Sequence, residues 1–196
     1  MSFSVLFVCT GNICRSPLSE RMFRSRIAVP TVHVSSAGTG ALVGYGIDGP
    51  SGLVLREHGV NPEGHFARAL TREIVHSADL ILSAESTHRT IMLNAEPGLF
   101  RRTFTMREFG RLGANLGPII GPPSDDELLR ERVTRVAAQR GWAQPPEAGS
   151  DEIGDPYGAG LDFARIIATQ ISSAVDGIIA ALGLSIIPHG EVDMER

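Results

Sequence analysis

Short apolar runs alternate along the chain with stretches in which apolar positions recur at helical spacing. Runs rich in β-branched and aromatic residues predict four strands, at 3–8, 31–35, 78–83 and 102–105. Apolar positions three and four residues apart predict helices at 17–27, 53–58, 87–93, 128–140 and 161–182, with a further short helix opening at 71. Such alternation is typical of a parallel sheet flanked by helices. We therefore expect an α/β protein, a three-layer sandwich around a four-stranded parallel sheet.

Composition narrows the class of protein. The 196 residues are 42% hydrophobic, which is enough to bury one sizeable core. The net charge of −4 gives no basis for binding nucleic acid, and we expect no nucleic-acid partner. All 18 basic residues are arginine, and this bias by itself indicates no site.

Cellular location is inferred from the cysteines and from the apolar runs. The two cysteines stand in one short loop and cannot form the disulfide framework of a secreted domain. The first residues lack the basic segment of a signal peptide, and no apolar run approaches the roughly 18 residues of a membrane span. We therefore expect a cytoplasmic protein without membrane insertion.

The loop between the first strand and the first helix carries the clearest chemistry. Its N–H groups gather at a helix N-terminus, where partial positive charge attracts anions. Cys9 stands beside that helix terminus and near Arg15, a setting that favours the nucleophilic thiolate. The planar guanidinium of Arg15 can hold two phosphoryl oxygens at once. This pattern predicts a site for a tetrahedral oxyanion next to a nucleophile.

Other residues of the loop suit the same purpose. The Ser16 hydroxyl can hydrogen-bond the thiolate, Asn12 tolerates left-handed backbone geometry, and Gly11 permits a tight curl. Pro17 fits the first turn of the following helix because its missing N–H costs nothing there. The residues expected to surround the phosphoryl group are Thr10, Gly11, Asn12, Ile13, Cys14 and Ser16.

Two strings of the sequence resemble a known family. CTGNICRSP at 9–17 resembles the signature of the low-molecular-weight protein tyrosine phosphatases, and DPY at 155–157 resembles the loop in which that family places its general acid. The resemblance covers roughly 3–109 and 152–183. It implies a phosphatase that hydrolyses phosphomonoesters, chiefly protein phosphotyrosine, through a cysteinyl phosphate. Cys9 would be the nucleophile, Asp155 the general acid and Arg15 the phosphate ligand.

The same resemblance implies partners and neighbouring residues. A phosphorylated protein would be the substrate and inorganic phosphate a product, with no metal and no other cofactor. Ser36 would contact the phosphate loop, unless it only shapes its turn, and His65 would brace Asn12. Tyr157 would line the pocket, and Leu42 falls where the family commonly carries an aromatic residue.

Cys14 follows Cys9 at a spacing that, in members of the family, allows a reversible disulfide protecting the nucleophile. We expect the same here, with a small loop residue packed against the sheet as the alternative. The test is mass spectrometry of tryptic peptides after mild peroxide treatment. Sulfinic acid at Cys9 without a link to Cys14 would contradict it.

The segment 110–150 departs most from the family. We interpret it as an insertion before the general-acid loop within one phosphatase domain that covers 1–196. We expect a solvated surface excursion, in preference to a wall of the substrate entrance or a partner-binding segment. The end of the chain, 188–196, is expected to be a flexible tail.

Three other functions fit parts of this pattern. Protein-arginine phosphatases resemble the chain but usually carry threonine where Ile13 stands, and isoleucine would crowd a guanidinium-bearing phosphate. An arsenate reductase would need cysteines after Cys14, and the sequence has none. A catalytically silent docking module would not need Cys9, Arg15 and Asp155 together. We therefore favour the phosphotyrosine phosphatase.

Overall fold

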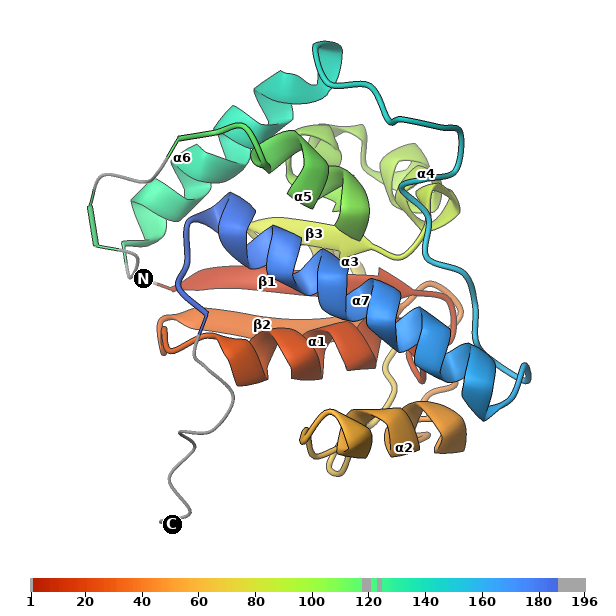
Figure 1. Ribbon diagram of the computed structural model, residues 1–196. Helices are drawn as coiled ribbons and strands as arrows, with labels where there is room; N and C mark the ends of the chain where they lie inside the picture. The colour runs from red at the N-terminus through yellow and green to blue at the C-terminus, as the bar shows by residue number, and fades with distance from the viewer. Residues whose placement is uncertain (1, 118–120, 123–124, 187–196) are drawn as a thin grey trace.

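The computed structural model describes residues 2–117, 121–122 and 125–186. Its centre is a sheet of four parallel strands in the order β2-β1-β3-β4 (Figure 1). The strands are β1 (Phe3–Cys9), β2 (Val32–Gly38), β3 (Leu80–Ser83) and β4 (Thr103–Thr105). The expected four-stranded parallel sheet is confirmed. The expected tail at 188–196 lies outside the described residues.

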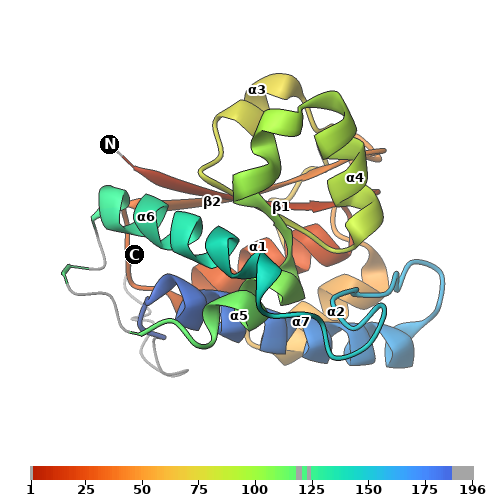
Figure 2. The same ribbon diagram turned by 90° about the horizontal axis from the view of Figure 1, so that it is seen from above.

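Helices cover both faces of the sheet, as Figure 2 shows from above. On one side lie α1 (Arg15–Arg26), α2 (Gly49–Glu57), α5 (Met106–Gly113) and α7 (Leu161–Leu182). On the other lie α3 (Arg72–His76), α4 (Ser86–Ala95) and the 3₁₀ helix η1 (Pro97–Arg102). The remaining helices are α6 (Asp126–Ala137) and the short 3₁₀ helix η2 (Ala138–Gly141).

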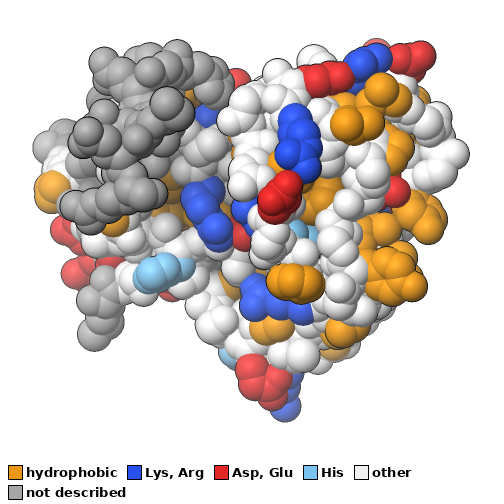
Figure 3. All heavy atoms as spheres, turned by 90° about the horizontal axis from the view of Figure 1, so that it is seen from below, with side chains coloured by type: hydrophobic (Ala, Val, Ile, Leu, Met, Phe, Trp, Pro, Cys, Tyr) orange, Lys and Arg blue, Asp and Glu red, His pale blue; other side chains and the backbone are white. Residues whose placement is uncertain are grey.

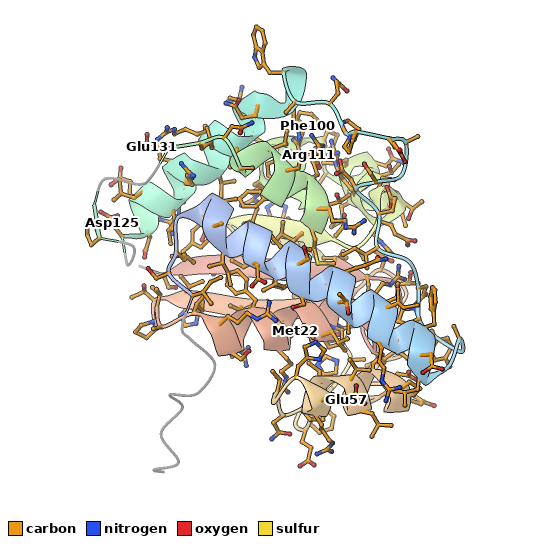
Figure 4. The ribbon with its side chains drawn as sticks, viewed as in Figure 1. Met22, Glu57, Phe100, Arg111, Asp125 and Glu131 are labelled. Carbon is orange, nitrogen blue, oxygen red and sulfur yellow. The ribbon has the colours of Figure 1, made fainter. Side chains whose placement is uncertain are left out.

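The alternation along β1 divides the core into two layers. Phe3, Val5 and Phe7 join the larger apolar cluster with α1, α5 and α7, whereas Leu6 and Val8 join the smaller cluster under α3 and α4. Successive side chains of a strand point to opposite faces, so a strand buried on both faces must be apolar throughout. Met22 of α1 lies fully buried between this helix and the sheet, and Figure 4 labels it.

Helix α7 is the one helix among the described residues that is long and apolar enough to be compared with a membrane span. By length and by a mean hydropathy of 1.3 it is apolar enough for a membrane span, although it carries charged residues and no uninterrupted apolar run. Half of its apolar window is buried inside the protein, against α5, α1 and α2. This is the pattern of a central core helix.

Helix α5 was not predicted from the sequence. It starts directly after β4 with a capping box, in which the Thr105 hydroxyl accepts from the Glu108 N–H and the Glu108 carboxylate accepts from the Thr105 N–H. It then packs closely on α7, because Gly110 meets Gly177 and Gly113 meets Ala181 without intervening side chains. With eight residues, the helix is too short for its apolar positions to form a recognisable helical pattern in the sequence.

We expect the Gly113→Ala substitution to destabilise the fold by about 1–3 kcal/mol, as overpacking of a core does. An added Cβ would lie 2.3 Å from the Ala181 Cβ, so the two helices would have to move apart. Urea unfolding measures the effect. Gly141→Ala is the control, because no atom lies within 4 Å of its added Cβ. Equal stability of the two variants would contradict the close helix contact.

The segment 110–150 is anchored to the domain by buried side chains. Leu129, Val133 and Val136 of α6 join the main core, and the fully buried Arg132 donates to the carbonyl oxygens of Leu116, Gly117 and Ala181. Asp125 caps the helix, and Glu131 is exposed on its outer side (Figure 4). The expected solvated excursion is therefore wrong for this helix. Whether the segment is an insertion remains a prediction.

Arginines also hold the part of this segment that follows α6. Arg140 stacks on the rings of Phe100 and Phe104, with its guanidinium carbon 4.5 and 4.0 Å from their centroids, and its Nε donates to Glu108. Arg111 forms a two-pronged ion pair with Asp151. Phe100 and Arg111 are labelled in Figure 4 on the same side of the molecule. These contacts lead the chain back to the carboxyl edge of the sheet.

Candidate active site

The phosphate loop joins the last residue of β1, Cys9, to the first residue of α1, Arg15. It lies at the carboxyl edge of the parallel sheet, where ligands of such folds bind. Asn12 adopts the left-handed conformation with φ +54°, as the sequence suggested it could. The loop borders a cavity of about 200 Å³, which is lined by Cys9, Thr10, Gly11, Ile13, Cys14, Arg15, Gly40, Leu42, Asp155 and Tyr157.

Hydrogen bonds fix which way the Asn12 amide points. Its Oδ1 accepts from the Arg68 N–H at 2.9 Å, so its Nδ2 is the donor to the hydroxyls of Ser16 and Ser36, both at 2.9 Å. Ser16 Oγ thus accepts from Asn12, and its own hydrogen is free to point at Cys9 Sγ, 3.0 Å away. The Ser16 hydroxyl can therefore donate to a Cys9 thiolate.

Ser36 and His65 lie where the sequence placed them. Ser36 lies on β2 near the phosphate loop. Its hydroxyl accepts a hydrogen bond from Asn12 Nδ2 and donates one to Glu20 Oε2 at 2.6 Å. His65 Nε2 lies 2.7 Å from the Asn12 carbonyl oxygen, so that nitrogen carries the hydrogen. Asn12 is therefore held through both its side chain and its carbonyl group, which keeps its strained backbone in place.

Arg15 is only 2% exposed and already binds two carboxylates. Its Nη1 lies 3.0 Å from Glu85 Oε2, and its Nη2 lies 2.9 Å from Asp155 Oδ2. Nη1 also donates to the Ile153 carbonyl oxygen at 3.1 Å. Its Nε is buried and finds no acceptor within the described part of the chain. A buried donor without a partner is costly, and an anion in the loop could satisfy it.

Asp155 comes from the far end of the sequence and meets the phosphate loop through this ion pair. Its side chain is about half exposed, and its Oδ1 accepts from the Tyr157 N–H at 3.2 Å. Leu42 and Tyr157 are partly exposed at the cavity's mouth. The structure thus brings Cys9, Arg15 and Asp155 to one cavity.

Glu85 and His88 also contact the loop, and sequence reasoning gave them no role. They form a capping box at the start of α4, in which the His88 Nδ1 accepts from the Glu85 N–H at 3.2 Å. Glu85 also pairs with Arg15, and His88 Nε2 lies 2.9 Å from Thr10 Oγ1. The signal in the sequence was the spacing Glu85-x-x-His88 directly after a buried strand.

Cys14 has a different environment from Cys9. It lies at the N-cap of α1, in a small apolar cluster with Ile13 and Ala67. Burial raises the pKa of the Cys14 thiol to about 12, although a hydrogen bond with Ser51 acts in the opposite direction. Both cysteines are free thiols. A disulfide between them under oxidation remains a prediction.

Further exposed apolar side chains lie near the mouth of the cavity. Val43, Tyr45 and Phe66 are 65, 66 and 72% exposed. The backbone of 44–45 is hydrogen-bonded to Ala67, which ties this loop beside the phosphate loop. Figure 3 shows one face of the protein, on which apolar and charged side chains are interspersed.

Comparison with known proteins decides the family. A model of the family described as low molecular weight phosphotyrosine protein phosphatase matches residues 4–113, more than half of the chain. The chain belongs to this family. Asp155 lies beyond the matched segment, so its assignment to the site rests on its contact with Arg15.

Relatives within the family are similar over part of their length. The low molecular weight protein-tyrosine-phosphatase Etp of Escherichia coli is 51% identical over 85 residues, which are 43% of this chain and 56% of Etp. The probable low molecular weight protein-tyrosine-phosphatase AmsI of Erwinia amylovora is 39% identical over 100 residues, 51% of this chain and 68% of AmsI. The chain therefore aligns with little more than half of Etp.

Solved structures are similar to this chain over most of its length. The crystal structure of the Erwinia amylovora tyrosine phosphatase AmsI covers 92% of this chain and 93% of its own, with a TM-score of 0.67 and 26% identity. The YwlE arginine phosphatase from Geobacillus stearothermophilus covers 92% of each chain, with a TM-score of 0.68. At 24% identity, this second likeness concerns the fold alone.

Proposed function

We propose that this chain hydrolyses protein phosphotyrosine through a cysteinyl-phosphate intermediate. The observation that carries the proposal is the hydrogen-bond chain from the Arg68 N–H through Asn12 and Ser16 to Cys9 Sγ. It leaves the Ser16 hydroxyl able to donate to a Cys9 thiolate in a small cavity that is also lined by the buried Arg15. This arrangement suits nucleophilic attack on a tetrahedral oxyanion.

In the first step, Cys9 Sγ forms a bond to phosphorus while the bond from phosphorus to the tyrosine oxygen breaks. Asp155 gives its proton to that leaving oxygen. In the second step, the Asp155 carboxylate takes a proton from water, the water oxygen bonds to phosphorus, and the sulfur leaves as thiolate. Inorganic phosphate is released, and Arg15 binds the phosphoryl oxygens throughout.

The ion pair between Arg15 and Asp155 indicates how the cycle starts. Nη2 of Arg15 donates to Asp155 Oδ2 at 2.9 Å, so a phosphoryl group that takes this donor releases the carboxyl group of Asp155. Nη1 remains paired with Glu85, which keeps the guanidinium in place. Binding of the substrate therefore frees the acid for the leaving oxygen.

The substrate would be a phosphorylated protein in a reducing compartment such as the cytoplasm, since Cys9 must stay reduced. Ile13 narrows the cavity with an apolar side chain, and Leu42 and Tyr157 add apolar surface at its mouth. A phenyl ring fits such walls without leaving a polar group unpaired, whereas a guanidinium would need acceptors. These features favour phosphotyrosine over phosphoarginine.

The test of this mechanism is to trap the intermediate. A ³²P-labelled phosphotyrosine peptide is mixed with the reduced protein in the presence of a metal chelator and quenched within milliseconds. We expect label on the tryptic peptide that contains Cys9, held through a phosphorus–sulfur bond that hydrolyses in mild acid. Turnover without a labelled enzyme, or turnover lost to chelation, would contradict the proposal. No turnover at all would favour an oxyanion-binding docking module.

A second measurement addresses the substrate. We expect kcat/KM for a phosphotyrosine peptide to exceed that for the matched phosphoarginine peptide by at least about 10-fold, the range that pocket shape provides. Ile13→Ala removes the bulk of this side chain from the cavity wall and should lower the ratio of the two kcat/KM values. A ratio in favour of phosphoarginine would show that the chain is an arginine phosphatase.

A further inference from the structure

The start of α4 touches the phosphate loop at two points. Glu85 binds Arg15 near the end of the loop, and His88 meets Thr10 at its beginning. Thr10 directly follows the nucleophile and is the one threonine that lines the cavity. His88 is only 2% exposed, so its ring is shielded from bulk water and depends on these contacts.

The contacts of His88 determine where its hydrogen is. The Glu85 N–H donates to Nδ1, so Nδ1 carries no hydrogen and Nε2 does. Nε2–H then donates to Thr10 Oγ1 at 2.9 Å. Desolvation and the charge of Arg15 lower the pKa of His88, against the opposite influence of Glu85, Asp155 and Glu152, and so favour the neutral ring.

We propose that His88 is a positioning residue that holds the Thr10 side chain against the wall of the cavity, so that the aromatic part of the substrate can enter. This inference rests on the proposed phosphatase function and adds to it a residue that shapes the cavity wall for the aromatic ring. Thr10 Cγ2 lies beside Gly40, which also lines the cavity, since a Cβ added at Gly40 would lie 3.6 Å from it. Rotation of Thr10 away from His88 would change the shape of the entrance.

A cap for α4 alone would not require this arrangement. The cap uses Nδ1, whereas Nε2 reaches a residue 78 positions earlier on another element. The two functions therefore belong to different ring nitrogens. Two amide substitutions of His88 separate these functions. The Asn side chain can place an acceptor near the position of Nδ1, and the Gln side chain can place a donor near the position of Nε2.

The test compares His88→Asn with His88→Gln. We expect His88→Asn to keep the stability of the unaltered chain but to raise KM for a phosphotyrosine peptide by about 5- to 10-fold, the value of one hydrogen bond. His88→Gln should lose stability but keep KM. In both variants kcat should change little, because the cavity wall contacts the substrate equally in the ground state and in the transition state. His76→Asn, at a half-exposed histidine of α3, is the control.

Two further measurements complete the test. Thr10→Val should raise KM as His88→Asn does, and the double variant should show no additional loss, because both changes remove one interaction. Binding of a nonhydrolysable benzylphosphonate should weaken in parallel, whereas inorganic phosphate, which lacks the ring, should bind unchanged. Unchanged KM in His88→Asn, or additive losses, would overturn the role of His88. Failure of the unaltered chain to bind benzylphosphonate would overturn the phosphatase proposal as well.

Discussion

Replacing Cys9 by serine is expected to reduce hydrolysis of a phosphotyrosine peptide by roughly 10⁵-fold or more, as loss of a nucleophile that acts with its partners does. The hydroxyl of serine is not ionised near neutral pH. It would also meet the Ser16 hydroxyl, which is placed to donate a hydrogen and not to remove one. Release of phosphate under reducing conditions measures the loss.

The matched control for this variant is Cys14→Ser, which changes the other thiol of the same loop. Cys14 is buried with a pKa of about 12 and packs on Ile13 and Ala67, so its thiol is protonated and unreactive near neutral pH. We expect this control to keep at least a tenth of the activity in the reduced state. Inactivation by Cys14→Ser with Cys9→Ser still active would exchange the roles of the two cysteines.

Strand β3 and most of β1 are buried on both faces and appear as apolar runs, whereas β2 alternates, with His33 exposed between the buried Val32 and Val34. Val5 to Val8 are apolar without a break because both faces of β1 are covered there, and such a run stands out in the sequence whatever packs on it. The long helix 161–182 was equally visible from its periodicity. Helix α5 was not, because its position depends on glycines, Gly110 and Gly113, that let it approach α7. A close approach of two distant segments leaves no local pattern.

The site also divides into residues that local sequence predicts and residues that the fold brings together. The phosphate loop was predictable because Cys9 to Ser16 lie in one uninterrupted string, so local spacing already fixes which groups meet. Glu85 and His88 enter the site only because β3 lies beside β1 and delivers the start of α4 to the same edge. Their contribution depends on strand order, and a single sequence does not display strand order.

The arginines of 110–150 were the least predictable feature. The segment was expected to be a solvated excursion, yet Arg132 and Arg140 are bound to backbone carbonyl oxygens and aromatic rings inside the domain. A guanidinium has five donors and a flat apolar face, so it can be buried where carbonyl groups surround it. Helix periodicity alone cannot distinguish such a side chain from a solvated one.

Asp155→Asn is expected to lower kcat for a phosphotyrosine peptide by about 10²–10⁴-fold, the usual contribution of a general acid. The amide can still accept a hydrogen bond from Arg15, so the loop should keep its position while the transferable proton is lost. Glu152→Gln is the control on the same loop, because its amide oxygen can still accept from the Ser86 N–H. We expect this control to be nearly as active as the unaltered chain.

The leaving group makes this prediction specific to proton transfer. The phenol of tyrosine has a pKa of about 10 and leaves poorly without a proton, whereas a strongly acidic phenol leaves readily as the anion. The loss in Asp155→Asn should therefore be largest for phosphotyrosine and shrink steadily for aryl phosphates with more acidic phenols, measured as kcat/KM under reducing conditions. A loss of the same size for every leaving group would show that Asp155 acts only by orienting Arg15. The acid would then have to be sought among other carboxylates near Arg15, first of all Glu85.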